Sequence, residues 1–173
     1  MPSTDHIGPF LNEEISERWT YYCCGQWDRV GNRFIAYPAF RNRILGIQLY
    51  KYGINGFLHW GYNYYYGMGS RRLINPYLTQ SGDGQVPGGD AFSVYPGSGG
   101  EPLPSSRLFV FFEALQDMSA LKLCEKIIGR EKTVSLIDGL AGFDVTFADY
   151  PKDAGYILSL REKVNGIIAR GSE

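Results

Sequence analysis

The chain has 173 residues, 44% of them hydrophobic and 15% aromatic, which predicts one domain or part of one. Lysine and arginine (17) nearly cancel aspartate and glutamate (18), so the net charge of −1 gives no long-range attraction for nucleic acid or an anionic membrane. Thirteen tyrosines and 22 glycines are more typical of a loop-rich binding surface than of a plain helical bundle.

The N-terminal sequence MPSTDHIGPF has neither the basic nor the apolar region of a signal peptide, and no run approaches the roughly 18 apolar residues of a membrane span. Cys23 and Cys24 are adjacent, where a bridge is strained, and Cys124 falls in a predicted helix. This pattern indicates reduced thiols. The sequence therefore predicts a soluble, cytoplasmic protein with no membrane partner, while a longer parent protein that is secreted stays open.

The first third of the chain predicts a strand, a helix and a second strand. Residues 18–24 (RWTYYCC) are aromatic and β-prone and form the first strand. Pro38 then opens a helix over 39–53, and Gly53 ends it. Residues 56–60 (GFLHW) form the second strand. The short connections indicate parallel strands with a right-handed crossover.

A long irregular segment and a strong helix follow. Residues 61–104 contain ten glycines and five prolines, and their embedded aromatic residues favour an ordered loop. The helix covers 104–129, with Ser105 or Ser106 as its cap. Its expected apolar stripe consists of Leu108, Phe112, Leu115, Leu121 and Ile128.

The order strand, helix, strand, long loop, long helix is the order in which a (β/α)8 barrel ends. Two strands cannot close a sheet, and such a barrel needs eight strands and about 250 residues. The sequence therefore predicts an α/β fold that forms the C-terminal segment of a TIM-like barrel. Two amphipathic helices expected at 131–140 and 153–171 add a helical tail.

Four segments, in order, resemble the C-terminal part of bacterial glycoside-hydrolase-like barrel proteins: WTYYCCG, NRFIAYPAFRNRILGIQLYKYGINGFLHWGYNYY, GGDAFSVYPG and PSSRLFVFFEALQD. These proteins carry a domain of unknown function and include glycoside hydrolase family 123, the β-N-acetylgalactosaminidases. The resemblance covers roughly residues 15–130. The family pattern is a GD…YPG loop, then S-x-R, then E-x-x-x-D in a helix. It matches Gly89, Asp90, Tyr95, Pro96, Gly97, Ser105, Arg107, Glu113 and Asp117.

The resemblance implies a barrel portion at residues 1–130 and a helical extension at 131–173. Family 123 enzymes are understood to use an Asp-Glu pair with the substrate's acetamido group, and that pair lies upstream of the matched segments. This chain has no Asp-Glu dipeptide. Adjacent Glu13 and Glu14 diverge and cannot flank one glycosidic bond at about 5 to 9 Å. We therefore expect no catalytic residue in this chain and no hydrolysis by it alone.

The stretch GINGFLHWGYNYYYG (53–67) concentrates aromatic side chains at the end of the second strand. Sugars stack on Trp and Tyr rings, whose polar groups bond hydroxyls. Alternate residues of a barrel strand share a face. We favour Gly56, Leu58, Trp60 and Tyr62 as the lumen-facing set, because Trp60 then ends over the site. Structural packing without a sugar is the alternative.

Residues outside this stretch extend the candidate site. Tyr21 lines it from the first strand, where Trp19 and Cys23 share its face. Asp90 would accept sugar hydroxyls, cap the following helix or pair with Arg107, and the pairing is the structural alternative. The predicted substrate-binding residues are Tyr21, Trp60, Tyr62, Asn63, Tyr65, Asp90 and Arg107.

No metal and no cofactor are predicted, because His6 and His59 lack zinc-ligand spacing with the cysteines, and His59 is expected to be packed or hydrogen-bonded. The sequence predicts the carbohydrate-lining part of a glycoside hydrolase that acts on N-acetylhexosamine-containing glycans. The alternative is a non-catalytic carbohydrate-binding or assembly module. Open strand edges also predict self-association or pairing with an upstream barrel segment.

Overall fold

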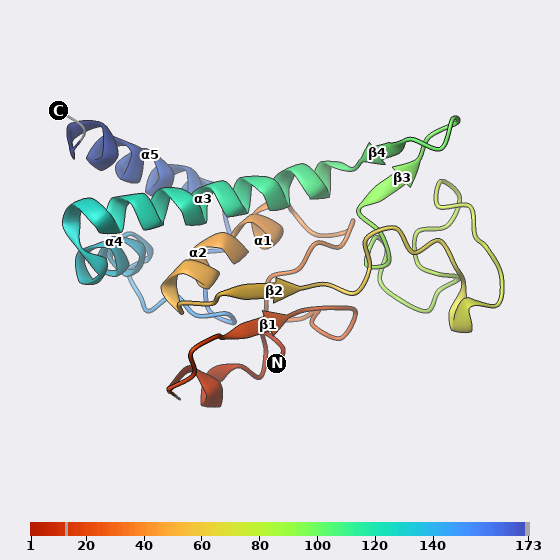
Figure 1. Ribbon diagram of the computed structural model, residues 1–173, viewed down its shortest axis with the longest axis horizontal. Coiled ribbons are helices and arrows are strands. Elements are labelled where there is room, and N and C mark those ends of the chain that lie inside the picture. The colour runs from red at the N-terminus through yellow and green to blue at the C-terminus, as the bar shows by residue number, and fades with distance from the viewer. Residues whose placement is uncertain (13, 172–173) are drawn as a thin grey trace.

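The computed structural model describes residues 1–12 and 14–171, with helices gathered at one end, long loops at the other and parallel strands between them (Figure 1). Glu13 therefore lies outside the described residues. In chain order, the elements are η1 (Gly8–Asn12), β1 (Trp19–Tyr21), α1 (Phe40–Arg43), α2 (Leu45–Lys51), β2 (Gly56–Leu58), η2 (Met68–Ser70), β3 (Val94–Pro96), β4 (Pro102–Pro104), α3 (Ser106–Ile128), α4 (Arg130–Ala141) and α5 (Ala154–Gly171).

β1 and β2 pair in parallel, as the short strand–helix–strand connections predict. Each strand is three residues long, shorter than the sequence pattern indicates. Ser3 forms a further parallel bridge to Tyr21 on β1. Thr20 and Tyr22 are fully buried, and Tyr22 packs in a cluster with side chains of α2. The sheet therefore has one face against the helices and one open face.

The helix predicted over 39–53 is divided into α1 and α2 at Ile44, while Gly53 ends it as expected. Gly53 has a φ of +59°, which favours glycine at this position after the helix. Gly46 permits the close approach of α2 to α3, because a Cβ at this position would overlap the carbonyl oxygen of Ala114. α2 is thus held against α3 by a glycine contact that the apolar periodicity does not reveal.

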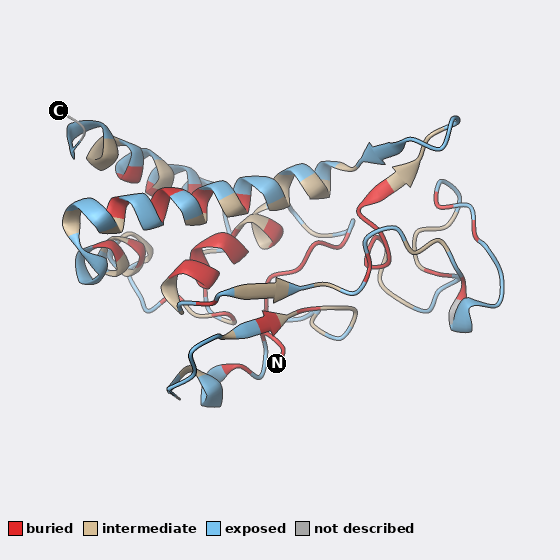
Figure 2. Ribbon diagram, viewed as in Figure 1, coloured by how far each residue is buried: buried red, intermediate tan, exposed pale blue. Residues whose placement is uncertain are grey.

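The main core lies between α2, α3, α4 and α5, and buried residues concentrate on α2 (Figure 2). Asp117 of α3 is buried in this region and accepts hydrogen bonds from Arg43 of α1 at 2.7 Å and from Arg161 of α5 at 2.7 Å. This carboxylate, part of the E-x-x-x-D pattern, therefore joins three helices. The core residues are Ile44, Ile47, Tyr50, Ala120, Leu121, Cys124, Ile137, Val145, Tyr150, Tyr156, Ile157, Leu160 and Val164.

α3 confirms the predicted strong helix, but its buried face differs from the predicted stripe. Phe112 is 55% exposed, although Leu121 is buried as expected. Small residues let the neighbouring helices approach, so the buried face is narrower than hydrophobicity alone indicates. Ser105 is the N-cap residue, yet its side chain makes no capping hydrogen bond. The buried residues of α3 are Ala114, Asp117, Ala120, Leu121 and Cys124.

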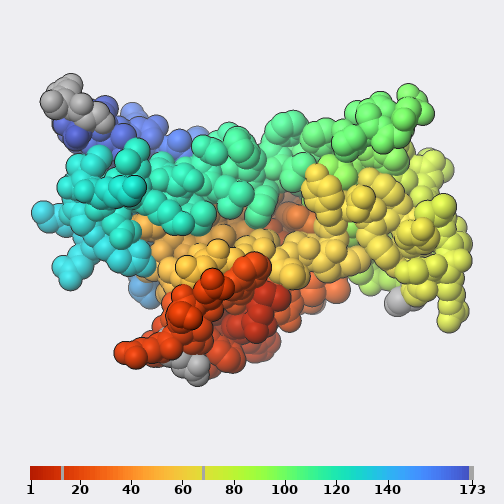
Figure 3. All heavy atoms as spheres, in the orientation of Figure 1, coloured from red at the N-terminus to blue at the C-terminus, as the bar shows by residue number. Residues whose placement is uncertain are grey.

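Residues 61–104 are mostly irregular, as predicted, and they gather at the end of the molecule away from α4 and α5 (Figure 3). The antiparallel pair β3 and β4 leads from this segment into α3. Asn63 forms an antiparallel bridge to Phe92, which lies fully buried. Backbone pairing and buried aromatic rings therefore order the segment.

The structure is a mixed α/β fold with a two-stranded parallel sheet and a separate two-stranded antiparallel sheet among the described residues. The barrel segment stays a prediction. The division at residue 130 also stays a prediction, and α4 and α5 share the main core with α2 and α3. Within residues 1–12 and 14–171, no helix combines the length and apolar character that crossing a membrane requires.

Candidate carbohydrate site

The open sheet face, defined as Trp19, Tyr21 and Leu58, is apolar and partly exposed. The parallel register pairs Trp19 with Gly56 and Tyr21 with Leu58, so these side chains share one side of the sheet. The Trp19 ring lies over Gly56, where a Cβ would overlap it. Trp19 is 45% and Leu58 42% exposed. This face carries the side chains that the sequence predicts to face a barrel lumen.

Trp60 lies just beyond β2 and is 43% exposed. It lines an open pocket of about 390 Å³ together with Tyr21, as the shared strand parity predicts. An exposed indole beside a phenol is the kind of surface on which a sugar ring stacks. The lining residues of this pocket are Met1, Tyr21, Cys23, Cys24, Leu58 and Trp60.

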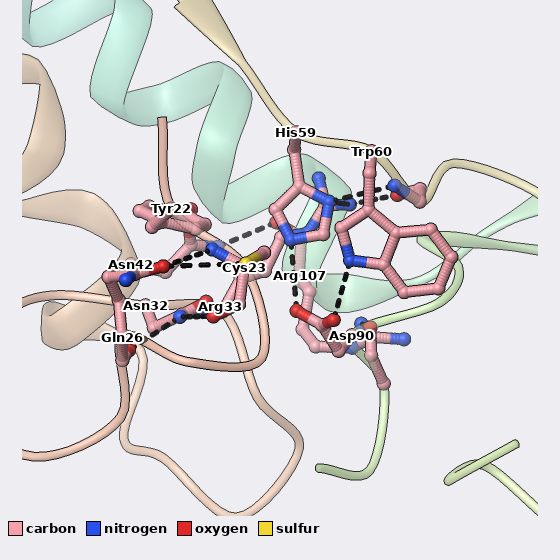
Figure 4. Close-up of polar contacts among 12 residues, drawn as sticks. Tyr22, Cys23, Gln26, Asn32, Arg33, Asn42, His59, Trp60, Asp90 and Arg107 are labelled. Carbon is pink, nitrogen blue, oxygen red and sulfur yellow. Dashed lines mark hydrogen bonds and ion pairs between the residues drawn. The ribbon is translucent and has the colours of Figure 1, made fainter. Parts of the chain in front are cut away.

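The Trp60 indole is held by a buried carboxylate (Figure 4). Trp60 Nε1 donates to Asp90 Oδ2 at 2.7 Å, and His59 Nε2 donates to Asp90 Oδ1 at 3.1 Å. Asp90 is fully buried, and both of its carboxylate oxygens accept hydrogen bonds from side chains of the protein. A direct contact between Asp90 and a sugar would require these groups to separate. In this arrangement Asp90 orients Trp60. The contact between Asp90 and sugar hydroxyls stays a prediction.

His59 is hydrogen-bonded and its side chain is only 4% exposed, which confirms the packed state expected for it. Its Nδ1 accepts from the backbone N–H of Gly61 at 3.1 Å and from Arg33 Nη2 at 2.7 Å. The proton therefore sits on Nε2, which faces Asp90. Burial lowers the pKa of His59, the bond to Asp90 opposes this, and repulsion from Arg33 adds to the lowering. The imidazole is thus held neutral in the fold.

Arg107 lies in the first turn of α3, and the predicted pairing of its side chain with Asp90 is wrong. Arg107 Nη1 instead donates to the carbonyl oxygen of Gly89 at 2.5 Å. Gly89 has a φ of +87°, and a Cβ there would meet the Arg107 guanidinium. The glycine thus lets the helix terminus hold the loop that carries Asp90.

The other predicted residues follow Trp60 along the chain. Tyr62 is 53% exposed, and its carbonyl oxygen accepts from the backbone N–H of Ser93 at 2.8 Å. Tyr65 is half-buried and donates its hydroxyl hydrogen to the carbonyl oxygen of Val94 at 2.8 Å. Asn63 is exposed. Their predicted role in sugar binding stays a prediction.

A sequence model described as the glycoside hydrolase 123 catalytic domain matches residues 1–124. The chain belongs to glycoside hydrolase family 123. This confirms the resemblance drawn from the sequence and implies carbohydrate substrates. All seven predicted binding residues lie within the matched family 123 range, whereas α4 and α5 follow it. A comparison with curated proteins gave no match.

The family 123 chain has no pair of carboxylates beside Trp60 in its described part, because no Asp or Glu lines that pocket. Asp117 is held by arginines, Asp83 pairs with Arg72 at 2.7 Å, and Asp138 accepts from Lys51 at 2.6 Å. Nor do the described residues bring three His, Cys, Asp or Glu side chains together as a metal site.

Sequence reasoning missed Arg33, which is 6% exposed and contacts both His59 and the carbonyl oxygen of Gly61. Arg33 lies in a segment between the first strand and α1 that has no periodic pattern. An arginine in the segment NRFIAYPAF, followed directly by the apolar residues Phe34 and Ile35, was the available signal. This signal did not identify the partner of Arg33, because His59 lies 26 positions further along the chain.

Proposed function

We propose that this chain forms part of a glycoside hydrolase site and presents Trp60 as a stacking platform for an N-acetylhexosamine-containing glycan. Tyr21 lines the same pocket, and Tyr62 continues the aromatic surface. The catalytic carboxylates come from another segment. In this proposal, the role of the chain is to bind and orient the sugar ring.

One observation carries this proposal: Trp60 is exposed, yet its indole is fixed by a buried carboxylate within a family 123 catalytic domain. A fixed ring loses little conformational freedom when a ligand stacks on it, which favours affinity. A surface tryptophan with a packing role alone would need no buried acceptor for its N–H. The family membership supplies the ligand class, and the fixed indole supplies the contact.

The alternative is a non-catalytic carbohydrate-binding module, which the lack of an open carboxylate pair in the described pocket favours. Both functions use Trp60 to bind sugar. The two functions differ in whether another segment supplies the catalytic carboxylic acid. In the hydrolase proposal, this chain combined with the segment that carries the acid hydrolyses aryl N-acetylhexosaminides, whereas a binding module does not.

Trp60→Ala tests the platform. We expect the affinity for N-acetylgalactosamine or N-acetylglucosamine to fall about twofold to tenfold, because a stacked ring contributes about 0.5–1.5 kcal/mol beyond its buried area. Calorimetric titration measures the affinity, and a denaturant melt measures the stability of each variant. Tyr62→Phe, which removes one exposed hydroxyl and keeps the ring, should produce a smaller loss.

Trp27→Ala is the matched control, because Trp27 is 63% exposed and lines a different cavity, beside Gln26 and Arg29. This variant should bind both sugars like the wild-type protein. Suppose that Trp60→Ala lowers the free energy of unfolding by about 3–5 kcal/mol while Tyr62→Phe leaves the sugar affinity unchanged. Trp60 is then a packing residue, and its proposed role as a stacking platform is wrong.

A further inference from the structure

A second cavity, of about 520 Å³, lies between the segment before α1 and the N-terminus of α3. Its volume is in the range of small-ligand sites. Tyr77 and Tyr95 both line this groove, with ring centroids 5.1 Å apart. The groove is distinct from the Trp60 pocket, and the two share no lining residue.

The groove has more positive than negative charge. Arg33 and Arg107 both line it, and no Asp or Glu is among its described lining residues. In the described part of the chain, neither arginine forms an ion pair with a carboxylate within 4.0 Å. The oxygens of the nearest buried carboxylate, Asp90, already accept from His59 and Trp60. Arg33 is buried and Arg107 is half-buried, and the single carboxylate charge of Asp90 acts on both. Buried cations are normally paired, so the two arginines exceed the nearby negative charge by one.

Three donors at this groove are buried and have no hydrogen-bond partner among the described residues: Arg33 Nε, Arg107 Nη2 and the Ser105 hydroxyl. Arg33 as a whole is 6% exposed. An unpartnered buried donor costs about 1–3 kcal/mol, and more when it is charged. Such donors indicate a ligand that accepts hydrogen bonds.

The N-terminus of α3 adds to the same preference. α3 has 23 residues, and Ser105 makes no side-chain capping hydrogen bond to it. The first N–H groups of a helix carry a partial positive charge that favours an anion. Burial lowers the pKa of Arg33 and repulsion from Arg107 adds to this lowering, while the Tyr22 hydroxyl and the Asp90 carboxylate oppose it.

We propose that this groove binds the carboxylate or sulfate group of an acidic saccharide. The oxyanion would accept from Arg107 and Ser105, while Arg33 supplies the second positive charge. Tyr77 and Tyr95 would lie against the sugar ring. The saccharide part of this inference rests on the proposed function, whereas the oxyanion part rests on the unpaired arginines and donors.

Calorimetric titration tests the proposal with four probes: inorganic sulfate, glucuronate, a sulfate ester of N-acetylgalactosamine, and neutral N-acetylgalactosamine. We expect the sulfate ester to bind at least about tenfold more tightly than the neutral sugar, because charge-assisted hydrogen bonds are roughly twice as strong as neutral ones. Equal affinities for these two sugars would overturn the proposal.

Ser105→Ala removes a hydroxyl that has no internal partner, so stability should be retained while the affinity for the sulfate ester falls at least about threefold. Arg107→Gln should weaken binding at least about tenfold. Arg72→Gln is the control, because Arg72 is an exposed arginine paired with Asp83 outside the groove. It removes the same charge and should leave the affinity within about twofold.

If Ser105→Ala binds the sulfate ester as tightly as the wild-type protein does, the groove is not the binding site. This test stands even if Arg107→Gln fails to fold. Inorganic sulfate that binds as tightly as the sugar ester would overturn the assignment to a saccharide. Failure of the Trp60 platform is distinguishable, since Trp60→Ala would then leave neutral-sugar affinity unchanged while Ser105→Ala still weakens the acidic sugar.

Discussion

At the scale of single residues, the buried carboxylate of Asp90 links the exposed Trp60 to the interior of the protein. His59 occupies the second oxygen of Asp90, and its other nitrogen faces Arg33. Each of these side chains fixes the hydrogen-bonding role of the next one. The orientation of the indole therefore depends on groups that no ligand needs to touch.

The neutral state of His59 predicts a pH-dependent stability. Burial lowers the pKa of His59 in the fold relative to its ordinary value of 6.5. The unfolded chain therefore takes up this proton first as the pH falls. We expect the free energy of unfolding to decrease as the pH drops through about 6.5, until the lower pKa of the folded state is reached. Denaturant melts between about pH 7.5 and pH 5.5 measure the slope.

His59→Gln should remove most of this slope, whatever it does to stability at neutral pH. His6→Gln is the control, because its side chain is 78% exposed and lies outside the cluster. A slope that persists unchanged in His59→Gln would show that other groups produce the pH dependence.

At the scale of elements, α2 and α3 make the closest packing contact through Gly46. Gly46→Ala would force the new methyl group against the carbonyl of Ala114. We expect a loss of about 1–3 kcal/mol in the free energy of unfolding, because a close-packed core relaxes only partly around added volume. Chemical denaturation measures this loss.

Gly139→Ala is the matched control within α4, because no heavy atom lies within 4 Å of a Cβ built there. The same substitution should gain about 0.5–1 kcal/mol, since alanine has the higher helix propensity. Similar effects of the two substitutions would contradict a tight helix contact at Gly46.

The elements themselves were largely predictable from sequence. The apolar periodicity predicts α3, and the connection lengths predict the parallel pairing of β1 and β2. The contacts between elements were not predictable from sequence. Asp117 bonds residues 74 and 44 positions away, and no local pattern specifies such partners. For the site, strand parity placed Tyr21 and Trp60 together, but it did not reveal the bonds of Asp90.

At the scale of the whole molecule, the open sheet face is the main feature without a described partner surface. Strand edges with unpaired N–H and C=O groups invite further pairing, and exposed apolar patches mark interfaces. Trp19 and Leu58 provide such a patch beside the edge of β2. An upstream barrel segment or a second copy of the chain would cover it, and both remain our proposals.

We expect the chain alone to self-associate through this open sheet face, in competition with sugar binding, because Tyr21 and Leu58 also line the Trp60 pocket. Leu58→Lys places a charge on the face and should shift sedimentation toward monomer, since burying an unpaired charge in an interface is costly. Leu58 is already 42% exposed, so its replacement should change stability by only about 0.5 kcal/mol.

Leu78→Lys is the control, because Leu78 is 82% exposed and lies in the loop-rich end. It should leave the association constant unchanged. A wild-type chain that sediments as a monomer at every concentration would argue against a barrel fragment and favour an independent carbohydrate-binding module.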